Sequence, residues 1–385
     1  MQPPRRVALL VETSNDYARG ILHGVRGYVR ETGGWSLYLR EQSRGQANVS
    51  WLSEWRGDGV IARIENTQIA EAVASTGLPA VDVSAARCID TIPWVETDDA
   101  AIADAAFEHL YERGLRRFGF CHQPGFNWST WRLERFRERA AEAGCPCAVH
   151  ESPAAADEGA AWAEDARCMA TWVADLETPA AVMACYDITA QRLLEACRIA
   201  DVAVPDDVAV IGVDNDELLC DLADPPLTSV IPDTWRTGYR AAELLDRMMA
   251  GKRVAPKAHL MKPLGIVERL STDMLAIDDP EVSEALRFIR GNACAGIKVT
   301  DVLAHVPLSR RALESRFRAL VGRTPHEQIE HVRLRRAREL LAETDLPVAQ
   351  VALRVGFEHN EYFSVFFKRA TGESPRTYRA RHARP

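Results

Sequence analysis

The chain has 385 residues and a formal net charge of −8 at pH 7, with 47% hydrophobic and 26% charged residues. This length predicts two or three domains, and the composition is typical of a soluble globular protein. No stretch reaches the length of a membrane span, and the apolar residues 7–11 are too few for a signal-peptide core. The nine cysteines show no zinc or disulfide spacing, so we expect reduced thiols in a cytoplasmic protein.

The charge is unevenly distributed along the chain. Residues 280–385 contain 19 Lys and Arg against 12 Asp and Glu, whereas the remainder contains 28 against 43. An acidic body with a basic tail predicts that only the tail binds a polyanion.

As far as about residue 275, short apolar runs alternate with helical patterns. The predicted strands lie in "RRVALLVET", "WSLYLRE", "DGVIARI", "AVDVS", "RFGFCH", "AAVMACYD" and "VAVIGVD". Helical patterns occupy residues 17–32, 131–143 and 188–200. This alternation predicts parallel sheets with helices on both faces, and its length suits two lobes better than one. No glycine-rich nucleotide signature follows a strand.

Beyond the acidic "IDDPE", the chain reads as successive amphipathic helices. We therefore predict a two-lobed α/β domain over residues 1–275, a linker over 276–282 and an all-α domain over 283–385.

The helical part contains an internal repeat. "VTDVLAHVPLSRRALESRFRALVGRTP" is similar to "VAQVALRVGFEHNEYFSVFFKRATGESP", with Leu313 and Phe317 matching Phe363 and Phe367 at an offset of 50. Each copy reads as a short helix, a tight turn and a second helix, which is helix-turn-helix geometry.

On a helical wheel the second helix of each unit has one apolar and one polar side. The apolar, core-facing sides are predicted to hold Leu313, Phe317 and Leu320, and Phe363, Phe366, Phe367 and Ala370. The polar sides, predicted to enter the DNA major groove, hold Arg310, Arg311, Glu314 and Arg318, and Asn360, Glu361, Ser364 and Lys368. A solvated surface is the alternative, but two stripes in one register within a basic segment favour DNA. Candidates for phosphate contacts between the units, if they are not merely solvated, are Arg333, Arg335, Arg336 and Arg338.

Residues 281–384 resemble the DNA-binding domain of the AraC/XylS family. The resemblance lies in "LSRRALESRFRALVGRTPHEQI", "RLRRARELL" and "VALRVGFEHNEYFSVFFKRATGESPRTYR". It implies a transcription regulator, usually an activator, that binds direct repeats in promoter DNA and contacts RNA polymerase. The base contacts that it implies are Arg310, Arg311 and Glu314 in the first unit and His359, Asn360 and Ser364 in the second.

The second half of the α/β body resembles the LacI/periplasmic sugar-binding fold, through "RRFGFCHQPGFNWSTWRLERF", "CYDITAQRLLEACRIADVAVPDDVAVIGVDND" and "DPPLTSV". The segments "ETSNDYARGILHGV" and "STDMLAIDDP" add a second likeness. Over nearly its whole length the chain is similar to regulators of xylose operons. This likeness implies that D-xylose is the effector, bound in a cleft at the carboxyl ends of the strands. We expect a homodimer in which sugar closes the cleft, with no cofactor or metal.

The candidate sugar ligands are polar or aromatic side chains at strand ends, namely Tyr17, Arg63 and Asp82 in the first lobe and Trp131, Arg132, Asp187, Asp214 and Asn215 in the second. Asp187 and Asp214 could instead cap helices, and Trp131 could serve packing alone. Spacing does not select xylose, so arabinose, ribose or a purine are alternatives. An enzyme is the least favoured class, because no nucleophile elbow, zinc motif or P-loop is present.

Overall fold

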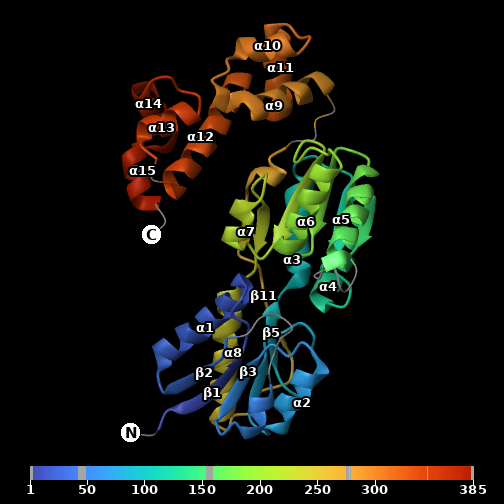
Figure 1. The fold of residues 1–385 in the computed structure, drawn as a ribbon, viewed down its shortest axis with the longest axis vertical. Helices are drawn as coiled ribbons and strands as arrows, with labels where there is room; N and C mark the ends of the chain where they lie inside the picture. The colour runs from blue at the N-terminus through green and yellow to red at the C-terminus, as the bar shows by residue number, and fades with distance from the viewer. Residues whose placement is uncertain are drawn as a thin grey trace. The chain divides into compact units, whose positions relative to one another are not determined.

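The computed structural model describes residues 3–41, 49–152, 159–274, 277, 279–344 and 346–382. The chain divides into two compact units, Met1–Met274 and Leu275–Pro385. The first is a two-lobed α/β body, and the described part of the second is helical (Figure 1). In the ranges described, no helix has the length and apolar character needed to cross a membrane.

The first lobe is built on a six-stranded sheet of order β11-β5-β4-β3-β1-β2. Its strands are β1 (Arg5–Leu10), β2 (Trp35–Leu39), β3 (Gly59–Ala62), β4 (Ala80–Asp82), β5 (Trp94–Thr97) and β11 (Ala258–Met261). Helices α1 (Asp16–Thr32) and α8 (Thr234–Met249) cover one face, and α2 (Thr67–Ser75) with the 3-10 helix η1 (Ser50–Glu54) covers the other. Strands buried on both faces need no polar alternation, which is why β3, and β1 from Val7 onward, read as continuous apolar runs.

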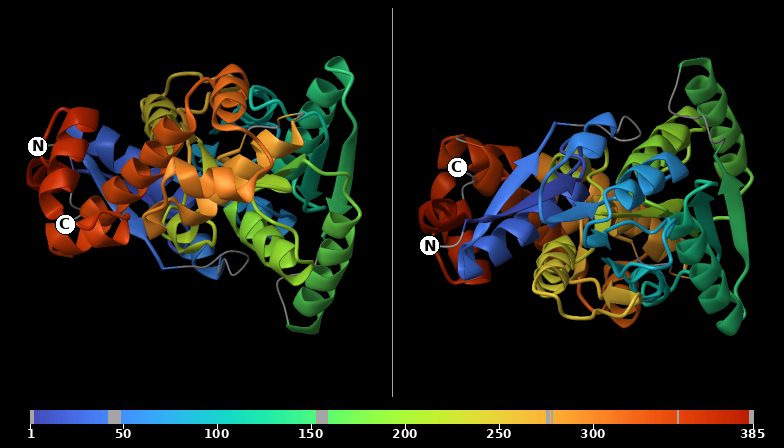
Figure 2. Two further views of the ribbon diagram at one scale, coloured as in Figure 1. Left: turned by 90° about the horizontal axis from the view of Figure 1, so that it is seen from above. Right: turned by 90° about the horizontal axis from the view of Figure 1, so that it is seen from below.

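The second lobe repeats this architecture in the order β12-β10-β9-β8-β6-β7. Its strands are β6 (Phe118–His122), β7 (Cys147–Glu151), β8 (Ala180–Ala184), β9 (Val208–Val213), β10 (Thr228–Ile231) and β12 (Gly265–Val267). The helices are α3 (Asp99–Tyr111), α4 (Asn127–Glu142), α5 (Gly159–Ala174), α6 (Asp187–Ile199) and α7 (Glu217–Leu222). Helices flank the strands of both lobes (Figure 1 and Figure 2).

The chain passes between the lobes three times, after β5, β10 and β11. Backbone hydrogen bonds join the crossing segments: the Asp98 N–H donates to Met261 O and the Leu264 N–H to Ile231 O, both at 2.8 Å. A few such segments between rigid lobes form a hinge, which lets the lobes rotate without loss of their cores.

The helical unit contains α9 (Pro280–Asn292), α10 (Val299–His305), α11 (Arg310–Val321), α12 (Pro325–Glu343), α13 (Val348–Arg354), α14 (Asn360–Thr371) and α15 (Pro375–His382). One apolar core joins α9, α10 and α11 to the first half of α12, and a second joins the rest of α12 to α13, α14 and α15. Helix α12 is therefore shared by two helix-turn-helix units, as the repeat predicts. Helix α9 begins at Pro280, inside the segment predicted as a linker.

Candidate ligand-binding cleft and DNA-binding surface

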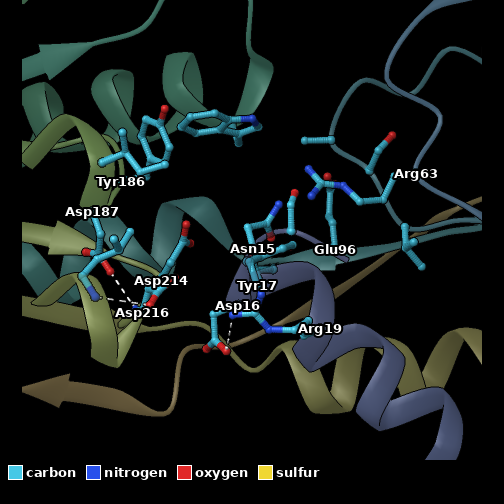
Figure 3. A pocket seen from close by; sticks show the side chains of 18 of the residues that line it. Asn15, Asp16, Tyr17, Arg19, Arg63, Glu96, Tyr186, Asp187, Asp214 and Asp216 are labelled. Carbon is cyan, nitrogen blue, oxygen red and sulfur yellow. Dashed lines mark hydrogen bonds and ion pairs between the residues drawn. The ribbon is translucent and has the colours of Figure 1, made fainter. Parts of the chain in front are cut away.

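A cavity of about 470 Å³ lies between the lobes of the first unit, at the carboxyl ends of the strands. Figure 3 shows that Arg63 and Glu96 face it from one side and Tyr186, Asp187 and Asp214 from the other. Open parallel sheets bind ligands at this edge, and the volume is that of a small-molecule site. The cavity-lining residues among the eight candidates are Tyr17, Arg63, Arg132, Asp187 and Asp214. The lining described does not include Asp82, Trp131 or Asn215.

Asp82 lies beneath the cavity. Its side chain is fully buried, and its Oδ1 accepts hydrogen bonds from the backbone N–H groups of Ile64 (3.1 Å) and Ser84 (2.8 Å). Burial raises the pKa of Asp82 to about 7. Asp82 therefore ties the loops that follow β3 and β4, and it positions Arg63 indirectly.

The aromatic ring of α4 that borders the cavity belongs to Trp128, whereas Trp131 stacks on Arg87. The guanidinium of Arg132 lies 5.2 Å from the centroid of the Trp128 ring. Residues four apart share a helix face, so the position of Arg132 could have identified Trp128 from the sequence.

Asn215 is turned away from the cavity, because its Oδ1 accepts a 2.9 Å hydrogen bond from Arg269 Nη1. Its φ angle is 49°, and that of Asp214, the residue before it, is 109°. Such backbone is strained for residues other than glycine and is common at functional sites. This turn places Asp214 at the cavity.

Arg63 is held in the first lobe by two carboxylates. Its Nη2 donates to Glu65 Oε1 at 2.6 Å, and its Nη1 lies 3.4 Å from Glu12 Oε2. Burial lowers the pKa of Arg63, but the charges of Glu65 and Glu12 outweigh it and leave the pKa raised. Its guanidinium lies 5.4 Å from the ring centroid of Tyr17, whose pKa burial raises to about 12. The buried Nε of Arg63 has no hydrogen-bond partner among the described residues.

Glu96, at the end of β5, is a cavity residue that the sequence reasoning missed. Its Oε1 accepts a hydrogen bond from Arg87 Nε at 3.2 Å and also pairs with Arg87 Nη2. Its Oε2 is buried and has no partner in the described part of the chain. Burial raises the pKa of Glu96 to about 7, against the opposing effect of Arg87. A buried acceptor left without a donor is costly, so a hydroxyl-bearing ligand would satisfy this atom.

In the second lobe, Arg132 is almost completely buried. It donates to Asp99 Oδ1 at 2.7 Å and to the carbonyl oxygen of Cys185 at 2.6 Å. The Asp187 carboxylate accepts from Ser229 Oγ at 2.6 Å and from the Asp216 N–H at 2.9 Å. Burial, and then the negative charge of Asp214, raise the pKa of Asp187. Asp187 thus also holds the loop after β9 in place.

The charge balance of the cavity limits what it can bind. Each arginine that borders it already pairs with a carboxylate of the protein: Arg19 with Asp16, Arg63 with Glu12 and Glu65, and Arg132 with Asp99. No lysine belongs to the described lining, whereas Glu96, Asp187 and Asp214 do. A cavity with this balance favours a neutral ligand rich in hydroxyl groups over an anion.

The second helices of the two helical repeats present the predicted polar side chains differently. On α11, Arg310, Arg311 and Arg318 are exposed and border a surface hollow with Glu314. Arg310 Nε donates to Glu314 Oε1 at 2.9 Å. Around the start of α14 and along it, the exposed members of the predicted set are His359, Glu361 and Lys368.

The other two predicted residues of α14 are partly buried. Asn360 Oδ1 is buried without a partner among the described residues, while the side chain of Ser364 is half-buried. The prediction that Leu320 and Ala370 face the core is wrong, since both are exposed. Each lies in the last turn of its helix.

The side chain of Arg333 binds backbone carbonyl groups of the helical unit and is not exposed for a phosphate contact. Its Nε donates to the carbonyl oxygen of Ala293 at 2.8 Å and its Nη2 to that of Ile297 at 2.9 Å. The guanidinium also lies 5.4 Å from the ring centroid of Phe357, and burial lowers the pKa of Arg333. These contacts occupy the group that a phosphate would need.

Three family models match the chain in order: the XylR N-terminal domain (residues 6–100), the periplasmic binding protein-like domain (107–272) and the helix-turn-helix domain (302–381). The xylose operon regulatory protein of Escherichia coli K12 is 34% identical over 382 residues, which cover 97% of this chain and 96% of that protein. Its counterpart in Haemophilus influenzae is 29% identical over 97% of this chain and 98% of that protein.

A solved structure of a xylose-binding transcription activator matches with a TM-score of 0.81 and 32% identity, covering all of both chains. A LacI-type protein from Alkaliphilus metalliredigens in complex with D-xylulofuranose matches 69% of this chain and 98% of that one, with a TM-score of 0.58 and 21% identity. At that identity the second likeness shows the fold alone.

A two-lobed α/β body with an interlobe cavity, followed by two helix-turn-helix units, defines a ligand-responsive, DNA-binding transcription regulator and not an enzyme. Its helix-turn-helix domain is of the AraC type. The chain belongs to the family of xylose operon regulatory proteins.

Proposed function

We propose that this regulator responds to D-xylose, which binds in the interlobe cavity, and that it activates transcription of genes for xylose use. The observation that carries the proposal is the end-to-end similarity to xylose operon regulatory proteins, which includes the cavity-bearing lobes. We further propose that it acts in the cytoplasm as a homodimer, on direct repeats in promoter DNA, and contacts RNA polymerase.

The chemistry of the cavity supports a neutral sugar as the effector. Arg63 Nε is a donor and Glu96 Oε2 an acceptor, and both are buried without partners among the described residues. Adjacent sugar hydroxyls can accept from the first and donate to the second. The rings of Trp128 and Tyr186, 5.4 Å apart in an edge-on arrangement, offer an apolar surface for sugar C–H groups.

The proposed response begins with closure of the cleft. A sugar that bonds to Arg63 and Glu96 of the first lobe and to Asp214 of the second would favour a closed arrangement of the hinge. That change shifts DNA affinity only if the sugar binds the two arrangements with different affinity. The direction expected for an activator is higher promoter occupancy with sugar.

Calorimetric titration of the full-length chain tests the effector. D-xylose is expected to bind most tightly. L-arabinose and D-ribose are expected to bind more weakly because each has one hydroxyl of opposite configuration, and D-glucose because its additional hydroxymethyl group needs space in the site. Asp214→Asn is expected to weaken D-xylose binding. Selective binding of another sugar would retain the regulator class and replace the effector.

Promoter affinity with and without D-xylose tests the coupling. The expected result is tighter binding and an altered nuclease footprint with sugar. An unchanged affinity and footprint in a chain that binds D-xylose would contradict the proposed activation.

A further inference from the structure

The outward face of α14 differs from the polar stripe that the sequence predicts. Its buried side chains are Phe363, Phe366 and Phe367. At about 100° per residue, the opposite face is centred on Glu361, Val365 and Lys368. All three are exposed, and 69% of the Val365 surface is accessible. A valine therefore stands at the middle of the face that a recognition helix presents to DNA.

The first unit presents a different chemistry at the corresponding positions. The offset of 50 residues that aligns the two units maps the α14 stripe onto Arg311, Ser315 and Arg318. These side chains are exposed and border the hollow on α11. The first unit thus offers two guanidinium groups, whereas the second offers an aliphatic group between a carboxylate and an ammonium group.

An aliphatic side chain can recognise one kind of group in the major groove. Valine has no hydrogen-bond donor or acceptor, so it cannot distinguish the nitrogen and oxygen atoms of the base edges. The thymine C5-methyl is the apolar group displayed there, and aliphatic contact with it discriminates between bases. Such contact also removes apolar surface from water on both sides, which is favourable.

We propose that Val365 determines base specificity by packing against thymine methyl groups in the major groove that α14 occupies. The second unit then selects a thymine-containing half-site, while the first reads guanine through Arg311 and Arg318. This inference concerns which DNA sequence is bound, so it is independent of the identity of the effector.

Replacement of thymine by uracil tests the inference, because it removes the C5-methyl group and keeps every hydrogen-bonding group. The operator is a duplex that the full-length chain selects from a randomised pool, and affinities are compared at one salt concentration. One or two thymine-to-uracil substitutions are expected to weaken binding of the wild-type chain about three- to fivefold, the effect of losing one buried methyl group. In Val365→Ala, which keeps only one, shorter-reaching methyl group, the same substitutions are expected to have a clearly smaller effect.

The matched control is Leu353→Ala on α13, where the side chain is 63% exposed but lies outside the recognition helix. It is expected to keep the wild-type sensitivity to uracil. Both variants should unfold at the wild-type temperature, since neither side chain is in the core. Uracil penalties that are as large in Val365→Ala as in the wild-type chain overturn the proposal, as does a selected operator in which no uracil substitution weakens the wild-type chain. If Val365→Ala bound DNA with normal affinity but no longer supported transcription, Val365 would contact a protein partner instead. That result would also overturn the proposal.

Discussion

The guanidinium of Arg87 lies 4.3 Å from the ring centroid of Trp131, so a loop of the first lobe stacks on helix α4 of the second. Asn127, at the start of α4, supports the same contact by donating from Nδ2 to the carbonyl oxygen of Ala85 at 3.1 Å. Arg87 also bonds to the cavity residue Glu96. The Arg87 side chain therefore orients the ligand-facing carboxylate of Glu96 and also makes a contact between the lobes.

Arg87→Ala is expected to weaken D-xylose binding about tenfold, because Glu96 loses the charge-assisted hydrogen bonds that orient it. Calorimetric titration measures the loss. The intrinsic fluorescence of Trp131, isolated by comparison with Trp131→Phe, should change at the same time. Arg116→Ala is the matched control, since Arg116 lies 3.8 Å from the ring centroid of Tyr111 and does not border the cavity. Equal sugar affinity in both variants would refute the role of Arg87.

Glu96 should make the stability of the sensor depend on pH. Its pKa is raised from 4.5 to about 7 by burial in the folded state, so the folded protein holds a proton that the unfolded chain releases. The free energy of unfolding is therefore expected to fall as pH rises from about 4.5 to about 7, by at most about 3 kcal/mol. Glu96→Gln should lack this contribution.

Urea unfolding of the wild-type chain and of Glu96→Gln across pH 4.5–8 measures the difference between their free energies of unfolding. The contributions of ionisable groups that both proteins share cancel in this difference. Arg87 and Asp99 are the charged neighbours that affect the Glu96 pKa in opposite directions. A difference between the two proteins that does not change with pH would show that Glu96 is ionised throughout.

Much of the sensor architecture could be predicted from the sequence, because strands such as β3 and β9 are apolar throughout and alternate with helices. Strand β5 escaped prediction because Glu96 and Thr97 give its end the polarity of a loop. That polarity reflects its position at the cavity, where the sheet must expose functional groups. The contact of Arg87 with Trp131 joins two lobes and leaves no local pattern.

In the DNA-binding unit the sequence likewise predicted the helices better than the direction in which their side chains face. The repeat predicted both helix-turn-helix units, and the wheel predicted the buried aromatics of α14. It did not place Val365 on the outward face, because the predicted stripe was chosen by polarity rather than by angle from the buried side. Tertiary packing, which buries Asn360 Oδ1 and exposes Ala370, determines which face of α14 is turned outward.

Two arginines of α12 should respond to substitution in different ways. Arg333→Ala removes the donor to the carbonyl oxygen of Ile297 and leaves that of Ala293 with only the 3.3 Å hydrogen bond from the Gly296 N–H. It is expected to lower the free energy of unfolding by about 2–3 kcal/mol. Arg338 is exposed on the same helix. Arg338→Ala is expected to keep stability, weaken binding to all sequences and reduce the slope of log affinity against log salt by about 1.

Chemical denaturation and salt titrations of operator binding separate the two effects. A salt-slope change in Arg333→Ala without loss of stability would contradict the structural role of Arg333.

Gly356 controls how closely the two helix-turn-helix units approach each other. Its φ angle is 83°, and a Cβ atom there would lie 2.8 Å from the backbone nitrogen of Gly296 and 3.0 Å from Ala293 O. Both are backbone atoms that a small shift of side chains cannot clear. Gly372 has the same φ angle but open space around its Cα, so Gly372→Ala reports left-handed strain alone, about 1–2 kcal/mol.

Gly356→Ala is expected to cost more than Gly372→Ala, because contact with the 293–296 segment adds to the strain. It should also change the spacing of the two recognition helices, so that they no longer match the half-sites of one operator. Thermal unfolding gives the difference in stability, and operators lengthened by one base pair between the half-sites test the geometry. The wild-type chain should bind the lengthened operator poorly, whereas Gly356→Ala should lose less affinity on lengthening. Equal stability of the two alanine variants, with equal discrimination against the longer operator, would show that the segments can move apart without consequence.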